Sequence, residues 1–366
     1  MKKIVFFSLF WLIFVNVFAL LALNRFNLNG DTAYAWIDPA KIVQEQSWNP
    51  VSFHSRWDSF WYIDIAENGY RLSPDNTLSN IVFFPLYPFL IRTISPLVFG
   101  DYVLAGWLIS VFSLIGAIIV FYKLLKEFHP AVNPETPIFY LLIFPTAFFL
   151  NAVYTESLFL LLSLLVFYYT FKGRFGLAGI FGLLAALTRV TGILLFIPVL
   201  WEFWKSRGTR KIFSLSFLPA LLIPFGTFLF FLYHYFRFGN FFLFFKVESA
   251  WGRAFQFNKE HFLLFSPPAV VNFLLDIAFA VFALAIVYYV FKRKWTSYGL
   301  YILATLLVAL STGTFMSIGR YILILFPMYI ALATTKSRYF EKSYTLCSLL
   351  LLALYIALFV NWYWAG

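Results

Sequence analysis

Residues 102–122 read YVLAGWLISVFSLIGAIIVFY, with no charged side chain and no proline. An α-helix needs about 20 apolar residues to cross the hydrocarbon core of a bilayer, and this run supplies them. Residues 4–23 and 344–363 form further uncharged runs of this kind. Only helices and closed barrels satisfy the backbone inside lipid, and barrels consist of short alternating strands. These long continuous runs therefore predict an all-α membrane protein.

The composition supports the same fold class. Of the 366 residues, 62% are hydrophobic and 12% are charged, whereas soluble domains average about 45–50% apolar and about 25% charged residues. A soluble fold of this composition would have too few polar residues to cover its surface. The sequence shows no separate soluble segment and no internal repeat, so we expect residues 1–366 to form one integral membrane domain.

The apolar runs predict about 11 transmembrane helices. The expected spans are 4–23, 102–122, 137–151, 155–171, 175–189, 190–203, 211–234, 268–291, 298–313, 319–335 and 344–363. The pair 175–189 and 190–203 is also compatible with one long tilted helix. Residues 81–99 contain prolines, among them Pro85 and Pro88, that interrupt helical hydrogen bonding. We expect a re-entrant or membrane-surface segment there.

Lysine and arginine favour the cytoplasmic side of a membrane, and this bias predicts the topology. Their clusters are Lys2-Lys3, Lys123/Lys126, Lys172/Arg174, Lys205/Arg207/Arg210/Lys211, Lys292-Arg293-Lys294 and Lys336/Arg338/Lys342. All lie on one side if 81–99 does not cross fully and 175–203 crosses twice. We then expect a cytoplasmic N-terminus with 4–23 as an uncleaved span, an external C-terminus, and long outer loops at 24–99 and 235–267 of a plasma-membrane protein.

The first outer loop contains a stretch dense in acids and aromatic residues. From Arg56 to Tyr70 it reads RWDSFWYIDIAENGY. Its spacing predicts an amphipathic helix on the membrane surface that ends at Asn68-Gly69, because glycine tolerates the left-handed cap. The Asp58 carboxylate is a candidate general base toward an acceptor hydroxyl beside a lipid-linked donor. The competing interpretation is a solvated acid on an interfacial helix.

Charged residues also mark the ends of predicted spans. Glu156 begins a span, where the helix dipole favours an acid whatever its function. Arg189 lies in an otherwise apolar stretch, and Arg320 opens a span on the predicted outer side, where positive charge is unusual. Guanidinium groups match phosphate oxygens, so a lipid phosphate is one candidate partner. The alternative partners are the carboxylates of Glu156, Asp58 and Glu248.

The second outer loop carries Trp251, Arg253 and His261, and we expect it to cover the site. No group of His, Cys, Asp and Glu in the sequence has metal-ligand spacing, and the sequence has no phosphate-binding glycine loop or GxSxG element. The sequence therefore requires no cofactor and leaves a divalent metal undecided. The net charge of +11 reflects cations at span ends, so we infer no nucleic-acid partner.

Several short patches of the sequence, taken together, resemble those of a known protein family. They are Arg56–Ser59 with Ile65–Tyr70, Phe83–Pro88, Tyr154–Phe159, Thr188–Gly192 and Gly319–Tyr321. In this order the chain resembles the PIG-V family of mannosyltransferases, which are polytopic glycosyltransferases of the GT-C superfamily. The chain is shorter than the eukaryotic members, so it looks like a prokaryotic relative with a different acceptor.

The resemblance implies a polyprenyl-phosphate mannose donor, or a related lipid-phosphate sugar, and inverting transfer on the non-cytoplasmic face. It implies Asp58 as the base, with Asp64 as a second candidate acid. Arg189 and Arg320 would bind the donor phosphate, assisted by Tyr321. Supporting residues would be Arg56, Trp57, Tyr70, Tyr154, Glu156, Trp251 and Arg253. The acceptor could be a lipid-linked glycan, a wall polymer or a protein.

Two other functions fit the sequence. A transporter or flippase for a lipid or anion would show repeats and interrupted helices at the bilayer midplane, whereas here prolines and charges gather toward one face. A non-catalytic subunit of a larger assembly would not need its charged residues to meet. The spatial separation of Asp58, Glu156, Arg189 and Arg320 therefore tests the single-site hypothesis.

Overall fold

The structure is a computed structural model that describes residues 2–25, 51–73, 78–208, 215–249, 267–312 and 315–363. All regular structure in these residues is helical, as the sequence predicts. Helices α1 (Lys2–Arg25), α5 (Tyr102–Phe128), α12 (Pro267–Lys292), α16 (Arg338–Val360) and the run Leu218–Phe238 are long and apolar enough to cross a bilayer. The last run comprises a 3-10 turn η7 (Leu218–Leu221) and α10 (Leu222–Phe238).

Shorter helices complete the body and the polar end. They are α3 (Ser59–Asn68), α4 (Leu86–Ile94), α6 (Glu135–Leu142), α7 (Glu156–Phe171), α8 (Phe175–Ala186), α9 (Phe196–Arg207), α11 (Leu243–Glu248), α13 (Thr296–Ser311), α14 (Ile318–Leu323) and α15 (Phe326–Ala333). The 3-10 turns are η1 (Ser52–His54), η2 (Asn80–Val82), η3 (Ser95–Val98), η4 (Ala147–Asn151) and η5 (Val190–Leu195). The lengths of several of these helices fall below that of a full span.

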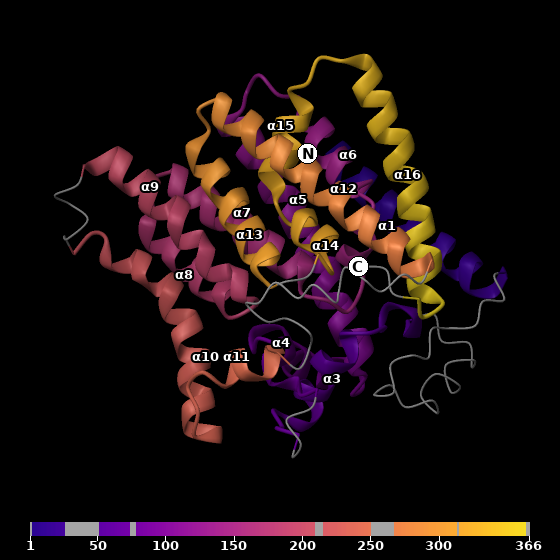
Figure 1. Cartoon of the computed structure of the whole chain (residues 1–366), viewed down its shortest axis with the longest axis vertical. Helices are drawn as coiled ribbons and strands as arrows, with labels where there is room; N and C mark the ends of the chain where they lie inside the picture. The colour runs from indigo at the N-terminus through magenta and orange to yellow at the C-terminus, as the bar shows by residue number, and fades with distance from the viewer. Residues whose placement is uncertain are drawn as a thin grey trace.

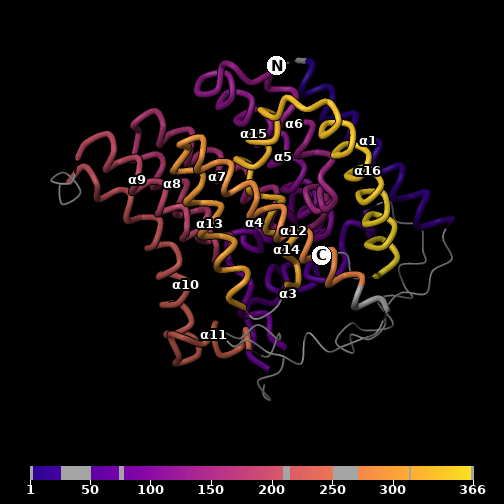
Figure 2. Tube along the Cα trace, turned by 45° about the horizontal axis from the view of Figure 1, so that its top comes forward, coloured from indigo at the N-terminus to yellow at the C-terminus, as the bar shows by residue number. Residues whose placement is uncertain are grey.

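The helices pack as one layered bundle (Figure 1). Helix α7 lies between α5 and α8, and α8 in turn packs on α10. The first and last long helices, α1 and α16, lie side by side at one edge (Figures 1 and 2). Helices α3 and α4 lie below the central helices of the bundle in Figure 1, and α11 lies between them and α10. The loop after the first span therefore folds as a cap on one end of the bundle.

Two predicted spans are broken, so their expected continuity was wrong. In 137–151, α6 stops at Leu142 and the chain continues past Pro145 as η4. In 319–335, α14 stops at Leu323, and Pro327 lies in the first turn of α15. Proline lacks the N–H that an uninterrupted helix needs and clashes with the preceding turn, so both breaks follow from the sequence.

The segment 81–99 and the pair 175–203 agree with the topology that the charges require. Helix α4 spans nine residues, about half of a full crossing. Phe175 at the start of α8 and Lys205 near the end of α9 line one cavity, so these helices run in opposite directions. The alternative of one long tilted helix is therefore wrong. Phe128 and Lys294 line the same cavity, which gathers the basic ends of α5, α9 and α12 opposite α3.

Glycines let α8 approach the start of α10 very closely. A Cβ on Gly179 would lie 1.9 Å from the carbonyl oxygen of Pro219, and one on Gly182 would lie 2.3 Å from a side-chain carbon of Ile223. Small residues are the usual means of close helix approach in membranes. This contact holds α8, whose C-terminal end leads to Arg189.

We expect Gly179→Ala to lower the free energy of unfolding by about 1–3 kcal/mol, because the backbone of Pro219 cannot yield to a new methyl group. Gly176→Ala is the matched control, since a Cβ added there would meet no neighbouring atom within 4 Å and alanine favours the helix by about 1 kcal/mol. Thermal unfolding of both variants in detergent measures the difference. Equal melting temperatures would contradict the close contact.

Candidate active site

Four charged side chains that are distant in sequence meet in one network. Arg320 donates from Nε to Oε1 of Glu156 at 2.9 Å and from Nη1 to Oδ2 of Asp58 at 2.7 Å. Nη1 of Arg189 lies 2.8 Å from the same Oε1 of Glu156. One carboxylate oxygen is thus shared by two guanidinium groups, and Asp58 joins them through Arg320. The ion pairing that the sequence offered as an alternative is the arrangement observed.

Three members of the network lie at a helix end or a chain break, and the fourth lies on a short helix. Asp58 immediately precedes α3, and Glu156 is the first residue of α7, where the helix dipole favours a negative charge. Arg189 has an extended backbone, with φ −153° and ψ 151°, between α8 and η5. Arg320 lies on the short helix α14. The breaks in the helices therefore bring these side chains to one end of the bundle.

The network has a closed side and an open side. The side chain of Glu156 is 0% exposed and that of Arg320 is 5% exposed, whereas Arg189 and Asp58 are 12% and 16% exposed. Two carboxylates balance two guanidinium groups, which is the condition for burying charge without a large penalty. The exposed edges of Asp58 and Arg189 are therefore the parts that a substrate can reach.

Tyr154 fixes the backbone on either side of Trp57. Its hydroxyl donates to the carbonyl of Arg56 at 3.0 Å and accepts from the N–H of Asp58 at 3.2 Å. The guanidinium carbon of Arg320 stands 4.7 Å from the centroid of the same ring, a cation–π contact. Tyr154 thus connects the first loop to the arginine that holds Asp58.

The C-terminal end of α16 clamps the first loop. Arg56 is buried and donates from Nε to the carbonyl of Val360 at 3.2 Å, with its guanidinium 4.5 Å from the Trp362 ring centroid. The indole of Trp57 donates to the carbonyl of Tyr363 at 3.2 Å. Trp57 has φ +55°, a left-handed conformation that costs energy for a residue with a large side chain. The clamp holds this conformation directly before Asp58.

The second candidate acid, Asp64, belongs to a different set of contacts. Its Oδ2 accepts from the amide of Asn80 at 2.7 Å, and its Oδ1 accepts from Asn68 at 2.9 Å. Arg71 Nη2 lies 3.5 Å from Oδ1. These partners tie α3 to the segment around η2. The structure therefore gives Asp64 a supporting place in the loop and does not join it to the network of Asp58.

Two tyrosines predicted to assist lie at the edges of the site. Tyr321 lies with its ring centroid 5.5 Å from the guanidinium carbon of Arg189. The hydroxyl of Tyr70 donates to the carbonyl of Phe83 at 2.7 Å, and its ring packs against Phe230. Trp251, Arg253 and His261 lie outside the described residues. Within the predicted second outer loop, 235–267, the structure describes residues up to 249, which include α11, and residue 267. The prediction that this loop covers the site is therefore not tested by the three residues named for it.

Sequence reasoning missed three contributors. Thr155 accepts from Nη1 of Arg189 at 3.2 Å. The carbonyl of His54 accepts from the N–H of Val153 at 3.0 Å, and burial lowers the pKa of the imidazole to about 3, so the ring is neutral. Tyr62 lies against Tyr154, with ring centroids 6.2 Å apart. Burial, and then the negative charges of Glu156 and Asp58, raises the pKa of Tyr62, so this phenol stays protonated and is no base.

The described residues contain no group of three or more His, Cys, Asp and Glu side chains that could hold a metal ion. The two carboxylates of the network, Asp58 and Glu156, are instead bridged by Arg320. Positive charge at this site is supplied by guanidinium groups. The site can therefore offer one partly exposed carboxylate beside two arginines.

Comparisons with known proteins agree with this architecture. No family model and no curated protein matches the chain. Among solved structures it resembles ArnT from Cupriavidus metallidurans, a structure with undecaprenyl phosphate bound, at 16% identity and a TM-score of 0.52. The chain therefore shares its overall helical fold with ArnT. The match covers 92% of this chain and 62% of ArnT, so the chain spans about three fifths of its neighbour's length.

The long apolar helices and the fold shared with ArnT support an integral membrane protein. Neither observation tests the mannose specificity of the PIG-V family. That specificity stays a prediction from the sequence patches. The first-loop carboxylate and the arginine of α14, which lie in separate patches of that resemblance, are in direct contact here. The single-site hypothesis thus passes the test of spatial separation for Asp58, Glu156, Arg189 and Arg320.

Removing the charge of Glu156 tests the energetic role of the network. We expect Glu156→Gln to lower the free energy of unfolding by about 3–5 kcal/mol, because two buried guanidinium groups lose their shared counter-charge. Glu135→Gln is the control, since Glu135 occupies the first turn of α6 and is exposed. Thermal unfolding in one detergent compares them. A similar small loss in both variants would contradict the buried network.

Proposed function

We propose that the chain is a membrane glycosyltransferase that moves a sugar from a polyprenyl-phosphate donor to an acceptor hydroxyl on the non-cytoplasmic face. The observation that carries this proposal is the Asp58 carboxylate, partly exposed and held at 2.7 Å by Arg320 beside a second arginine. The site supplies a base and a place for a phosphate within one network. The fold shared with ArnT, a protein solved with undecaprenyl phosphate bound, supports the donor class.

The reaction is an inverting single displacement. Asp58 takes the proton of the acceptor hydroxyl, whose oxygen forms a bond to the anomeric carbon of the donor sugar. The bond between that carbon and the phosphate oxygen breaks, and its electron pair leaves with polyprenyl phosphate. Arg189 and Arg320 balance the charge that develops on the phosphate, so a strong acid is not needed. This scheme requires one carboxylate base, in agreement with the separate place of Asp64.

An apolar cavity beside the site offers room for the lipid of the donor. It has a volume of about 390 Å³ and lies between α3, α4, α8 and α10. Tyr70, Pro88, Phe230 and Leu187 are among its lining residues. Leu187 stands two positions before Arg189 in the chain. We therefore assign this cavity to the isoprenoid chain of the donor.

Mannose is the proposed sugar, because the sequence patches resemble the PIG-V family. The direct experiment incubates membranes containing the chain with a panel of polyprenyl-phosphate sugars and identifies the labelled product, which also reveals the acceptor. Labelling from the mannose donor supports the proposal. Lipid movement by the purified chain in liposomes, with no sugar transfer from any donor, would favour the transporter function instead.

Asp58→Asn should lower sugar transfer by about 10²–10⁴-fold, because the amide cannot accept the proton. The matched control is Asp64→Asn, the same chemical change on the helix that Asp58 precedes. We expect it to keep most activity, since Asp64 contacts Asn80 and Arg71 rather than the arginine network. Initial rates are compared at equal amounts of folded protein. Full activity of Asp58→Asn would disprove its role as base.

The C-terminal clamp makes a second prediction about the rate. Trp362→Ala should reduce kcat more than it changes KM, because the backbone before Asp58 loses its support while the donor cavity stays intact. Trp204→Ala is the control, since Trp204 is 41% exposed on α9 at the other end of the bundle. Steady-state kinetics with the active donor measures both constants. An unchanged kcat in Trp362→Ala would show that the clamp does not position the base.

A further inference from the structure

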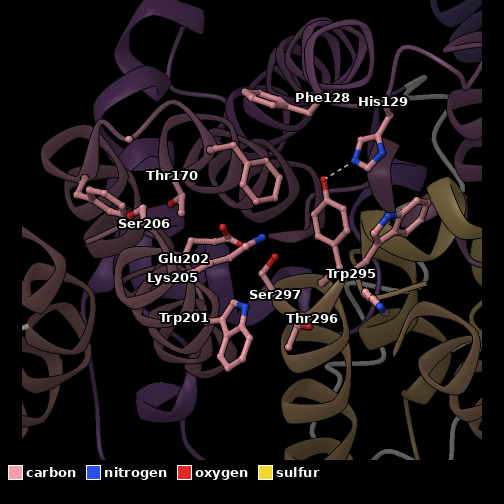
Figure 3. A pocket seen from close by; sticks show the side chains of 15 residues that line it. Phe128, His129, Thr170, Trp201, Glu202, Lys205, Ser206, Trp295, Thr296 and Ser297 are labelled. Atoms are coloured by element: carbon pink, nitrogen blue, oxygen red, sulfur yellow. Dashed lines mark hydrogen bonds between the residues drawn. The ribbon is translucent and has the colours of Figure 1, made fainter. Parts of the chain in front are cut away.

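A second cavity, with a polar lining, is shown in Figure 3. It lies at the opposite end of the bundle from Asp58. It has a volume of about 370 Å³ and is lined by the ends of α5, α7, α9 and α12 and the start of α13. Helix α7 separates the two sites, with Glu156 at its first turn and Thr170 at its last. Sixteen helical residues extend about 24 Å, so this cavity is not part of the proposed active site.

The charges around this cavity favour an anion. Lys205 and Lys294 line it, against the single lining carboxylate of Glu202. Arg207 and Arg293 stand over aromatic rings of the lining, with guanidinium carbons 5.8 Å and 5.9 Å from the ring centroids. Within the described residues neither lysine forms an ion pair. Among the described lining residues, positive charge therefore exceeds negative charge, with two lysines against one glutamate.

Neutral donors surround the same space. The Thr170 side chain lines the cavity, is 3% exposed, and its hydroxyl has no hydrogen-bond partner among the described residues. Trp201 contributes an indole to the lining (Figure 3). His129 lies 3.0 Å from the hydroxyl of Tyr298, and burial lowers its pKa to about 4, so it adds hydrogen bonding without charge. The lining thus combines cations with uncharged polar groups, as phosphate sites do.

The backbone at Lys294 has a left-handed conformation. This residue has φ +59° after the end of α12, a position that glycine normally fills. Gly173, which follows α7 and lines the same cavity, has φ +68° and fills the equivalent position in the usual way. A lysine is strained there, yet Lys294 occupies this position in the lining of the cavity. Strain of this kind is typical of residues that contact a ligand.

We propose that this cavity binds the phosphate headgroup of an anionic membrane lipid. Basic pockets between transmembrane helices on the cytoplasmic side recognise such headgroups through lysine and arginine. The cavity lies where the basic ends of the helices gather, and Trp201 and Trp295 beside it are residues typical of the membrane interface. The site is independent of the proposed sugar transfer.

The test measures lipid retention by the full chain in detergent with native mass spectrometry. The probe is dioleoyl-phosphatidylglycerol, and dioleoyl-phosphatidylcholine is the neutral comparison. We expect preferential binding of phosphatidylglycerol, weakened about tenfold or more in the double variant Lys205→Gln/Lys294→Gln. Lys336→Gln/Lys342→Gln is the matched control, which removes the same charge from exposed residues outside the cavity lining. Equal loss in both double variants would overturn the site.

Lys294→Gly separates binding from folding. Glycine relieves the left-handed backbone, so the melting temperature should stay equal or rise while phosphatidylglycerol binding weakens. Unchanged binding in this variant would contradict the proposal, as would equal retention of the neutral lipid. Glycerol 3-phosphate, added as a soluble competitor of phosphatidylglycerol, distinguishes a membrane lipid from a soluble phosphate compound as the ligand. Absence of competition supports a membrane lipid, and full displacement at equal concentration would overturn the lipid in favour of a soluble phosphate compound.

Discussion

The arrangement of the polar end depends on one oxygen atom, Oε1 of Glu156, which contacts both Arg189 and Arg320. A carboxylate with no exposed surface is strongly destabilising unless it is paired. Here the pairing requires α7, the link after α8, and α14 to meet at one point. Once Arg320 is held there, its second nitrogen fixes Asp58 and with it the start of α3. The buried charge of Glu156 thus helps to place Asp58 and the start of α3 at this end of the bundle.

Other side chains satisfy the irregular backbone at this end of the bundle. Buried backbone N–H and C=O groups that lack helical partners need hydrogen bonds from other groups. The Tyr154 hydroxyl accepts a hydrogen bond from the N–H of Asp58 and donates one to the carbonyl of Arg56. The guanidinium group of Arg56 in turn donates hydrogen bonds to the carbonyls of Ser52, Ser55 and Val360. Side chains therefore replace the hydrogen bonds that a continuous helix would have made.

Hydropathy and charge predicted the helical fold and the end of the bundle at which the polar residues gather. They did not predict partners, because Glu156 and Arg320 are 164 positions apart and nothing local decides between a phosphate and a carboxylate. The clamp was also beyond the sequence, since Trp362 after an apolar span resembles an ordinary interfacial anchor. Asp58 and Asp64 looked alike in one short stretch. Only the contacts with Arg320 and with Asn80 separate them.

The neutrality of the network has a consequence for the proposed reaction. Two guanidinium groups already balance two carboxylates, so a donor phosphate adds a negative charge that needs one of these cations. Glu156 is fully buried at the start of a helix, whereas Asp58 is 16% exposed at the end of a loop. Phosphate contact with Arg320 would therefore weaken its hold on Asp58 rather than on Glu156. Donor binding would then free the base, and a site without donor would keep that carboxylate paired.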